Sequence, residues 1–189
     1  MPEKTFILIV SLCFLVISLG VKSTETIDTP REIISGTWYE MKSVTMNEIR
    51  PYAVHLPPSY LENKDKHYPV LYVLDGYDTR MRGVGGLIES LSYYDLSQQI
   101  PEFIVVAIPN TNRTRDLIPT KNDLIFNGKV LDKLADNSGG ADIFATFMRE
   151  ELFPQIEVDF RATKQRGILG MSFGGLFAAH VLLKHPEMF

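Results

Sequence analysis

The chain has 189 residues, of which 45% are hydrophobic and 22% are charged, so it is long enough for one domain with a sizeable core. Its formal net charge is −4, and neither sign forms a long run, so it lacks the basic footprint of a nucleic-acid-binding protein. The one cysteine, Cys13, excludes an intrachain disulfide.

Residues 1–23 resemble a secretory signal peptide. Lys4 precedes the nearly unbroken apolar run of residues 6–19, and Val21-Lys22-Ser23 offers small or modest residues for cleavage after Ser23. The run is short against the about 20 residues that span a bilayer, and an uncleaved anchor is the alternative. We therefore expect a secreted or periplasmic protein, with no stable membrane association after cleavage and a mature chain of residues 24–189.

Five strands are predicted in chain order from β-branched, aromatic and apolar runs. The first two carry alternating patterns, and the last three are continuously apolar, which is typical of strands covered on both faces. Pro57-Pro58-Ser59 ends the second strand, and Pro69 stands where the third one starts. The ranges are 37–48, 50–56, 70–74, 103–108 and 167–169.

Three helices are predicted between and after these strands, over residues 87–99, 141–158 and 173–184. The second has apolar residues at helical spacing along one face. Residues 111–140 are polar and rich in Asn and Asp, which indicates a long surface loop. Strands that alternate with helices predict an α/β fold, a mostly parallel sheet with helices on both faces.

The stretch Gly170-Met171-Ser172-Phe173-Gly174 lies between the last strand and the last helix. This G-x-S-x-G pattern in a strand–turn–helix context is typical of a nucleophile elbow, in which a sharp turn exposes a serine. A serine hydroxyl is a weak nucleophile, so it needs a base, an orienting acid and donors for the oxyanion. The alternative is a serine in an ordinary glycine-rich turn.

Three segments carry a resemblance to a known family. They are Tyr68-Pro69-Val70-Leu71-Tyr72-Val73-Leu74-Asp75-Gly76, Asn110-Thr111-Asn112-Arg113-Thr114-Arg115-Asp116, and Leu169–Gly175 with the closing His185–Phe189. With these motifs in this order, residues 50–189 resemble the putative-esterase family of α/β-hydrolases, the group that contains esterase D, enterochelin-type and feruloyl esterases.

The resemblance implies an α/β-hydrolase fold and a serine carboxylic-ester hydrolase that acts on a small-molecule ester without a cofactor or metal. Ser172 would be the nucleophile, and the backbone N–H groups of Phe173 and Tyr77 would bind the oxyanion. For Asp75 a turn-forming role is the simpler interpretation. Arg113 and Arg115 are candidate substrate-binding residues, and the alternative for both is a mutually paired charge cluster.

The chain departs from the family pattern because it ends 17 residues after Ser172, where family members continue with strands that carry the acid and the histidine. None of the histidines His55, His67, His180 and His185 is predicted to replace that base. We expect the N-terminal part of an esterase domain, a fragment whose C-terminal strands are missing. The elbow strand would then form an apolar sheet edge that favours self-association.

Three functions remain open at this point. The first is an exported serine esterase that acts through an acyl-enzyme on Ser172 and is incomplete as given. The second is an acyltransferase of the mycolyltransferase type. The third is a catalytically inactive binding module, if the short chain is genuine.

Overall fold

A computed structural model describes residues 35–94, 99–121, 125–130 and 137–189. The chain divides into two units, residues 1–32 and 33–189, and all described residues belong to the second. The predicted signal peptide and its cleavage point lie outside the described residues. Within the described residues, no helix is long and apolar enough to cross a membrane.

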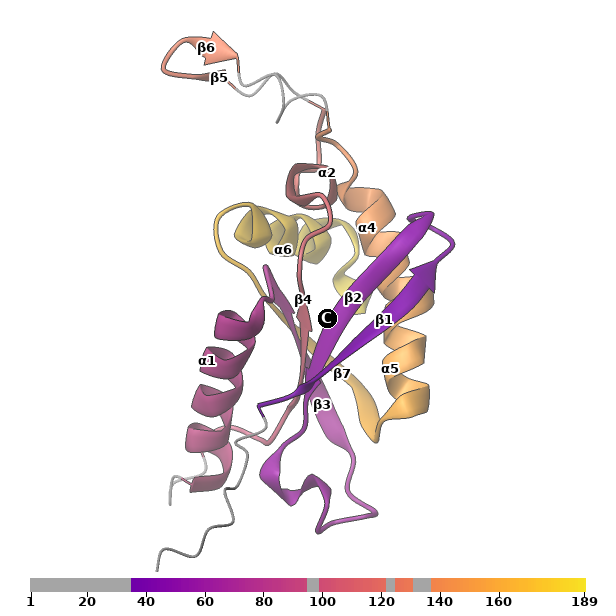
Figure 1. The fold of residues 1–189 in the computed structure, drawn as a ribbon, viewed down its shortest axis with the longest axis vertical. Helices are drawn as coiled ribbons and strands as arrows, with labels where there is room; N and C mark the ends of the chain where they lie inside the picture. Colours follow the sequence, from indigo (N-terminus) through magenta and orange to yellow (C-terminus); the bar gives the residue numbers. More distant parts are fainter. Residues whose placement is uncertain (1–34, 95–98, 122–124, 131–136) are drawn as a thin grey trace, which may run out of the picture. The chain divides into compact units, whose positions relative to one another are not determined.

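The second unit is built on a mixed sheet of five strands in the order β1-β2-β4-β3-β7 (Figure 1). β3 is parallel to both β4 and β7, whereas β2 is antiparallel to β1 and β4. Leu74 pairs with Ile108, so β3 and β4 end at the same edge of the sheet. The strands are β1 (Thr37–Ser43), β2 (Glu48–His55), β3 (Tyr68–Leu74), β4 (Ile104–Ile108) and β7 (Ala162–Leu169).

Helices connect the strands, and three of them come directly after a strand of the parallel part of the sheet. α1 (Asp78–Glu89) follows β3, the short α2 (Arg113–Leu117) follows β4, and α6 (Phe173–Lys184) follows β7. The remaining elements are η1 (Pro58–Tyr60), the π-helical η2 (Ser90–Tyr94), the hairpin β5 (Ile125–Phe126) and β6 (Lys129–Val130), α4 (Ala141–Phe147), the π-helical η3 (Met148–Leu152), α5 (Phe153–Asp159) and η4 (Pro186–Met188).

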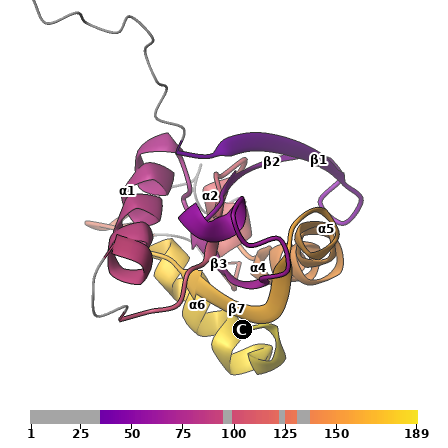
Figure 2. The same cartoon turned by 90° about the horizontal axis from the view of Figure 1, so that it is seen from below.

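Both faces of the sheet are covered by helices, as the sequence predicted. Val54 and Val106 belong to the main core with Phe144 of α4 and Phe177 of α6, whereas Ala53 and Ala107 pack with Met81 of α1. Successive strand residues point to opposite faces, so these two clusters lie on opposite sides of the sheet. Figure 2 shows α1 on one side and α4 and α5 on the other. The fold is therefore of the predicted α/β class.

The helix predicted over residues 87–99 was wrong at its start, because α1 begins at Asp78. Gly83, Gly85 and Gly86 weaken the helical signal in this segment. Gly85 has a packing reason, since a Cβ there would come within 3.1 Å of the His55 ring. The far end of that prediction includes residues 95–98, which are not described.

The long loop predicted over residues 111–140 was wrong in part. It contains α2 and the β5–β6 hairpin, while residues 122–124 and 131–136 lie outside the described part. The Asn112 side chain accepts a hydrogen bond from the Arg115 N–H at 3.1 Å and so caps α2.

Two further boundaries differ from the sequence-based ones. The first strand ends at Ser43 rather than at residue 48, because a turn ending at Asn47, with φ of 52°, leads into β2. β7 starts at Ala162, well before the apolar residues that signalled it, and lies at the edge of the sheet, half-exposed along most of its length. An edge strand needs fewer apolar residues than a central one, which is why its first half went undetected.

Candidate active site

Ser172 lies at the sharp turn between β7 and α6 with φ of 58° and ψ of −120° (Figure 1). A positive φ is uncommon for any residue other than glycine and marks local strain that the surroundings must hold in place. The Gly174 N–H donates to the Met171 carbonyl at 3.0 Å, and the Leu176 N–H donates to the Ser172 carbonyl at 2.9 Å. The serine side chain is exposed at the N-terminus of α6.

Two glycines flank this turn, and they differ in how closely the neighbouring atoms approach them. A Cβ on Gly170 would lie 2.3 Å from the Gly174 carbonyl oxygen, a contact with rigid backbone. A Cβ on Gly174 would lie 3.4 Å from both the Leu74 Cβ and the Asp75 Oδ2. The turn therefore requires glycine at position 170, whereas a Cβ at position 174 would make ordinary van der Waals contacts.

Asp75 comes directly after β3 and lies close to Gly174 of this turn. It also has a positive φ, of 53°. Its carboxylate accepts a pair of hydrogen bonds from Arg113, Nε to Oδ1 at 2.7 Å and Nη2 to Oδ2 at 3.0 Å. Asn110 Nδ2 donates to Oδ1 at 2.6 Å, and Arg80 Nη1 lies 3.8 Å from Oδ2. The carboxylate thus ties the ends of β3 and β4 to α2, beyond the turn-forming role that was its simpler interpretation.

Burial by itself raises the pKa of the Asp75 carboxyl. The hydrogen bonds from Arg113 and Asn110 outweigh burial, so its pKa lies below the usual range and the group is ionised at neutral pH. The same contact raises the pKa of Arg113.

Arg113 connects the Asp75 turn to the elbow. Its Nη2 lies 3.4 Å from the Met171 carbonyl, and its guanidinium carbon lies 5.0 Å from the centre of the Phe173 ring. One guanidinium therefore contacts both loops from which the predicted oxyanion donors come. Its side chain is 36% exposed, so it borders the open surface beside Ser172.

Arg115, unlike Arg113, contacts Glu48 and Asp116. Its Nη2 lies 2.7 Å from Glu48 Oε1 and its Nε lies 2.7 Å from Asp116 Oδ1, which links α2 to the start of β2. Hydrogen bonding to Glu48 raises the pKa of Arg115, and the bond from Arg115 contributes most to lowering the pKa of Glu48 to about 2. Within this network the buried Arg50 donates to the fully buried Asp116 at 2.7 Å. Arg115 does not join the group around Ser172.

The two predicted oxyanion donors differ in their present partners. Phe173 is the first residue of α6, where the helix provides no acceptor for its N–H. The N–H of Tyr77 donates to the Asp75 carbonyl at 3.0 Å, so it must turn away from that oxygen, or share its proton, to bind an oxyanion.

All four histidines have contacts away from Ser172. His55 Nδ1 lies 3.0 Å from the Ser35 carbonyl, His67 Nδ1 lies 3.2 Å from the Asp65 carbonyl, and His180 Nε2 lies 2.6 Å from Asp142. His185 Nε2 lies 4.0 Å from the same carboxylate. In the described part of the chain, Ser172 has no histidine hydrogen bond. The same part contains no group of three or more His, Cys, Asp or Glu side chains placed to hold a metal ion.

A mixed sheet covered by helices on both faces, with a strand–turn–helix at Ser172, is the architecture of the α/β-hydrolase fold. The chain belongs to the family described as "Putative esterase", whose model matches residues 43–189. It is 32% identical to the ferri-bacillibactin esterase BesA of Bacillus subtilis over 168 residues, which are 82% of this chain and 56% of that protein. It is 28% identical to the uncharacterized protein YbbA of the same organism over 143 residues, 74% of this chain and 53% of YbbA.

Comparison with solved structures also places the chain in the α/β-hydrolase fold. An IroE-like serine hydrolase from Shewanella oneidensis superposes with a TM-score of 0.74 at 34% identity, covering 82% of this chain and 48% of that one. The BES protein of Bacillus cereus gives a TM-score of 0.68 at 26% identity, covering 87% and 62%. The chain thus spans about half the length of the curated relatives that it matches.

Proposed function

We propose that Ser172 is the nucleophile of a serine carboxylic-ester hydrolase that works through an acyl-enzyme. The observation that carries the proposal is the strained backbone of Ser172, held between Gly170 and Gly174 at the N-terminus of α6. Strain of this kind at an exposed serine presents the hydroxyl to a substrate, and the family is one of esterases.

In this mechanism the Ser172 Oγ attacks the ester carbonyl and the alcohol leaves, so an acyl group is bonded to the serine. Water then attacks the acyl-enzyme and releases the acid. The Phe173 N–H stabilises the negative charge on the carbonyl oxygen, and the Tyr77 N–H joins it once released from the Asp75 carbonyl. Each such donor typically contributes about 10²–10³ in kcat. The proposal requires a base that the four histidines of this chain do not supply.

Among the substrate classes compatible with the sequence, we favour siderophore esters. Two relatives are named for such compounds, the ferri-bacillibactin esterase and the apo-salmochelin esterase of Escherichia coli O6:H1, 32% identical over 122 residues. Arg113 would contact an anionic or phenolic group of the substrate with the part of its guanidinium left open beside Ser172. Export through the segment 1–23 would place the enzyme outside the cytoplasm.

The test uses the protein translated from its complete coding sequence and an activated aryl ester. Ser172→Ala should abolish turnover, because it removes the attacking oxygen. Ser90→Ala, an exposed serine in η2, serves as the matched control and should keep wild-type activity. Equal turnover by the Ser172→Ala variant would remove this serine from the mechanism. Product analysis in the presence of an added alcohol distinguishes hydrolysis from acyl transfer.

A further inference from the structure

The short helix α2 carries Arg113 to the candidate active site, and a buried ion pair attaches the same helix to the sheet. Arg50 of β2 donates from Nη1 to Asp116 Oδ2 at 2.7 Å, and the two side chains are 1% and 0% exposed. The same nitrogen donates to the hydroxyl of Thr111, which comes shortly before the first residue of α2. Arg50 therefore holds the chain at residues before and after Arg113.

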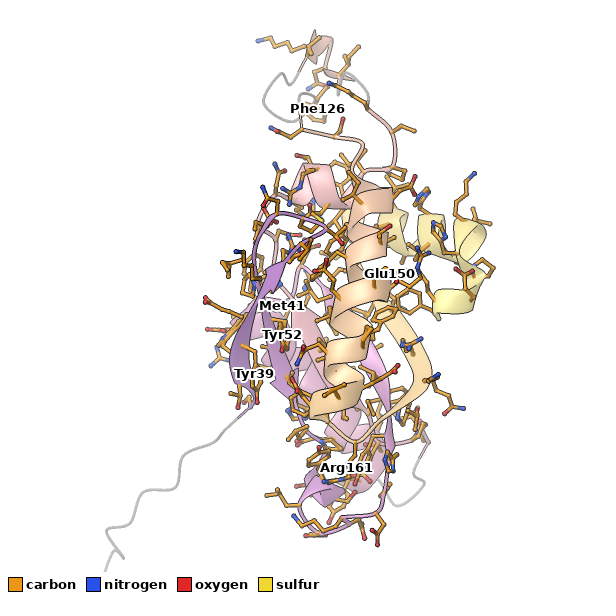
Figure 3. All side chains as sticks on the ribbon, turned by 90° about the vertical axis from the view of Figure 1, so that its right-hand side faces the viewer. Tyr39, Met41, Tyr52, Phe126, Glu150 and Arg161 are labelled. Atoms are coloured by element: carbon orange, nitrogen blue, oxygen red, sulfur yellow. The ribbon has the colours of Figure 1, made fainter. Side chains whose placement is uncertain are left out.

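Neither member of this pair can touch a substrate. The Arg50 guanidinium carbon lies 5.0 Å and 5.4 Å from the ring centres of Phe144 and Phe147, both in α4. Figure 3 shows α2, in pink, beside the first turns of α4, in pale orange. The pair thus lies where β2, α2 and α4 meet, so any influence on the candidate active site must pass through another residue.

Stability alone does not account for a buried ion pair at this point. Removing two charges from water has a cost that their attraction only partly returns, and an apolar pair of similar volume is often as stable. Within the described residues, the buried Nε of Arg50 has no hydrogen-bond partner, which adds to this cost. Leu117, which is 1% exposed, already gives α2 an attachment to the main core. The ion pair adds direction, because hydrogen bonds depend on angle and apolar contacts do not.

The direction that the pair can fix is the rotation of α2 about its axis. Arg113 and Asp116 are three residues apart, so they are neighbours on one face of the helix. The Arg113 guanidinium extends about 6 Å from the axis, half the diameter of a helix with its side chains. A rotation of about 20° would move it by about 2 Å, whereas N–H···O distances vary by only about 0.5 Å. Such a rotation would break the paired hydrogen bonds from Arg113 to Asp75, of 2.7 Å and 3.0 Å.

The other contacts of α2 constrain this rotation less. Backbone N–H groups just before α4 donate to the carbonyls of Arg115 and Ile118 at 2.9 Å and 3.0 Å. These bonds fix the C-terminal end of α2 and leave its other end to Arg50. The Arg115 side chain also contacts Asp116, but it is 30% exposed, so water competes for this contact.

We propose that Arg50 and Asp116 are positioning residues. Their buried ion pair sets the rotation of α2 and thereby holds Arg113 against Asp75 and the elbow. The coupling between the pair and Asp75 is a property of the fold and can be measured without a substrate. An effect of the pair on substrate binding through Arg113 rests on the proposed function.

A double-mutant cycle measures the coupling in the protein from its complete coding sequence. The variant Arg50→Met/Asp116→Leu replaces the ion pair by apolar side chains and should fold with a melting temperature near that of wild type. Asp75→Asn should lower the urea midpoint of the wild-type protein. In the apolar-pair variant it should lower the midpoint by less than half as much, because Arg113 no longer meets the carboxylate. An undiminished effect of Asp75→Asn would overturn the proposal.

A second variant, Arg50→Lys, takes the place of the apolar pair in the cycle if that pair prevents folding. The lysine retains the buried positive charge, but its ammonium ends one atom short of Nη1, so the bonds to Asp116 and Thr111 lengthen. The effect of Asp75→Asn on the urea midpoint should again be smaller than in wild type. Equal effects in wild type and in Arg50→Lys would overturn the proposal.

Arg115→Met is the matched control, because it removes from Asp116 an arginine that is partly exposed rather than buried. It should lower stability, yet leave the effect of Asp75→Asn on the urea midpoint at its wild-type size. A reduction as large as that in the apolar-pair variant would show a general loosening of α2 and would overturn the specific role of Arg50.

Kinetics test the consequence for the proposed reaction. In the apolar-pair variant, the KM for 4-nitrophenyl hemisuccinate, an ester with an anionic acyl group, should rise about fivefold, the upper end for an exposed ion pair. The kcat for the neutral 4-nitrophenyl acetate should stay within about twofold of wild type. An unchanged KM would overturn the effect on substrate binding, whereas the cycle, which needs no substrate, would still decide the positioning. Activity that survives Ser172→Ala would instead contradict the proposed function.

Discussion

Replacing Asp75 by Asn tests the contact that joins the two loops of the candidate site. The side chain keeps its size, but the carboxylate loses its charge, and the amide NH₂ replaces an oxygen that accepts from Arg113 or Asn110. A hydrogen bond to a charged group contributes about 1.5–3 kcal/mol. Because Arg113 is 36% exposed and solvent screens its charge, we expect a loss of about 2 kcal/mol in the free energy of unfolding.

The loss should depend on pH in a defined direction. The pKa of Asp75 is lowered in the folded protein, so its stabilisation is complete above the unfolded pKa, about 3.9, and is lost as the pH falls through the folded value. The difference between wild type and Asp75→Asn should therefore be largest at neutral pH and shrink in acid below pH 4.

Urea denaturation followed by circular dichroism measures both effects. Asp65→Asn is the control, because its exposed carboxylate has no side-chain partner among the described residues. Arg113→Lys should also destabilise, since a lysine cannot form the paired hydrogen bonds of the guanidinium. A loss below about 0.5 kcal/mol in Asp75→Asn, or one that persists unchanged at acid pH, would refute this role of the carboxylate.

Three more predictions concern the glycine of the elbow and the Glu48–Arg115 pair. Gly170→Ala should lower the melting temperature by several degrees and reduce ester turnover, because the new Cβ would lie 2.3 Å from the Gly174 oxygen. Gly83→Ala is the control, because the space around its Cβ is open, and it should be neutral or stabilising by up to about 1 kcal/mol. Equal effects of Gly170→Ala and Gly83→Ala would contradict the close packing at Gly170. Glu48→Gln should destabilise by about 1 kcal/mol at neutral pH. This difference should vanish as the pH falls from 4.5 toward 2 in denaturation series, since the pKa of Glu48 is lowered to about 2. Arg115→Met should lower the free energy of unfolding but leave the KM for an aryl ester unchanged. A raised KM would show that Arg115 contributes to substrate binding.

The sequence predicted the elbow and its helix well because both depend on local chemistry. The five residues Gly170–Gly174 predict a turn that carries Ser172 and a helix that starts at Phe173. The structure has both, and α6 has the predicted bounds. Ser172, Phe173 and Arg113 were also predicted, and the structure brings them together.

The parts that the sequence did not predict depend on contacts between distant residues. Asn110 as a partner of Asp75 requires β3 and β4 to end side by side, which is a property of the sheet rather than of either segment. Gly83, Gly85 and Gly86 weakened the helical signal at the start of α1, and of these only Gly85 packs against His55. Arg113 and Arg115 are two residues apart and so face different partners, which only the folded α2 reveals.

The most direct test of the central claim is covalent trapping at Ser172. The protein from its complete coding sequence is treated with a fluorophosphonate, digested, and analysed by mass spectrometry. An activated Ser172 should carry the phosphonyl group on the peptide that contains Gly170–Gly174, and heat-denatured protein should carry none there. An intact, unmodified peptide from a folded protein that still hydrolyses esters would show that another residue is the nucleophile.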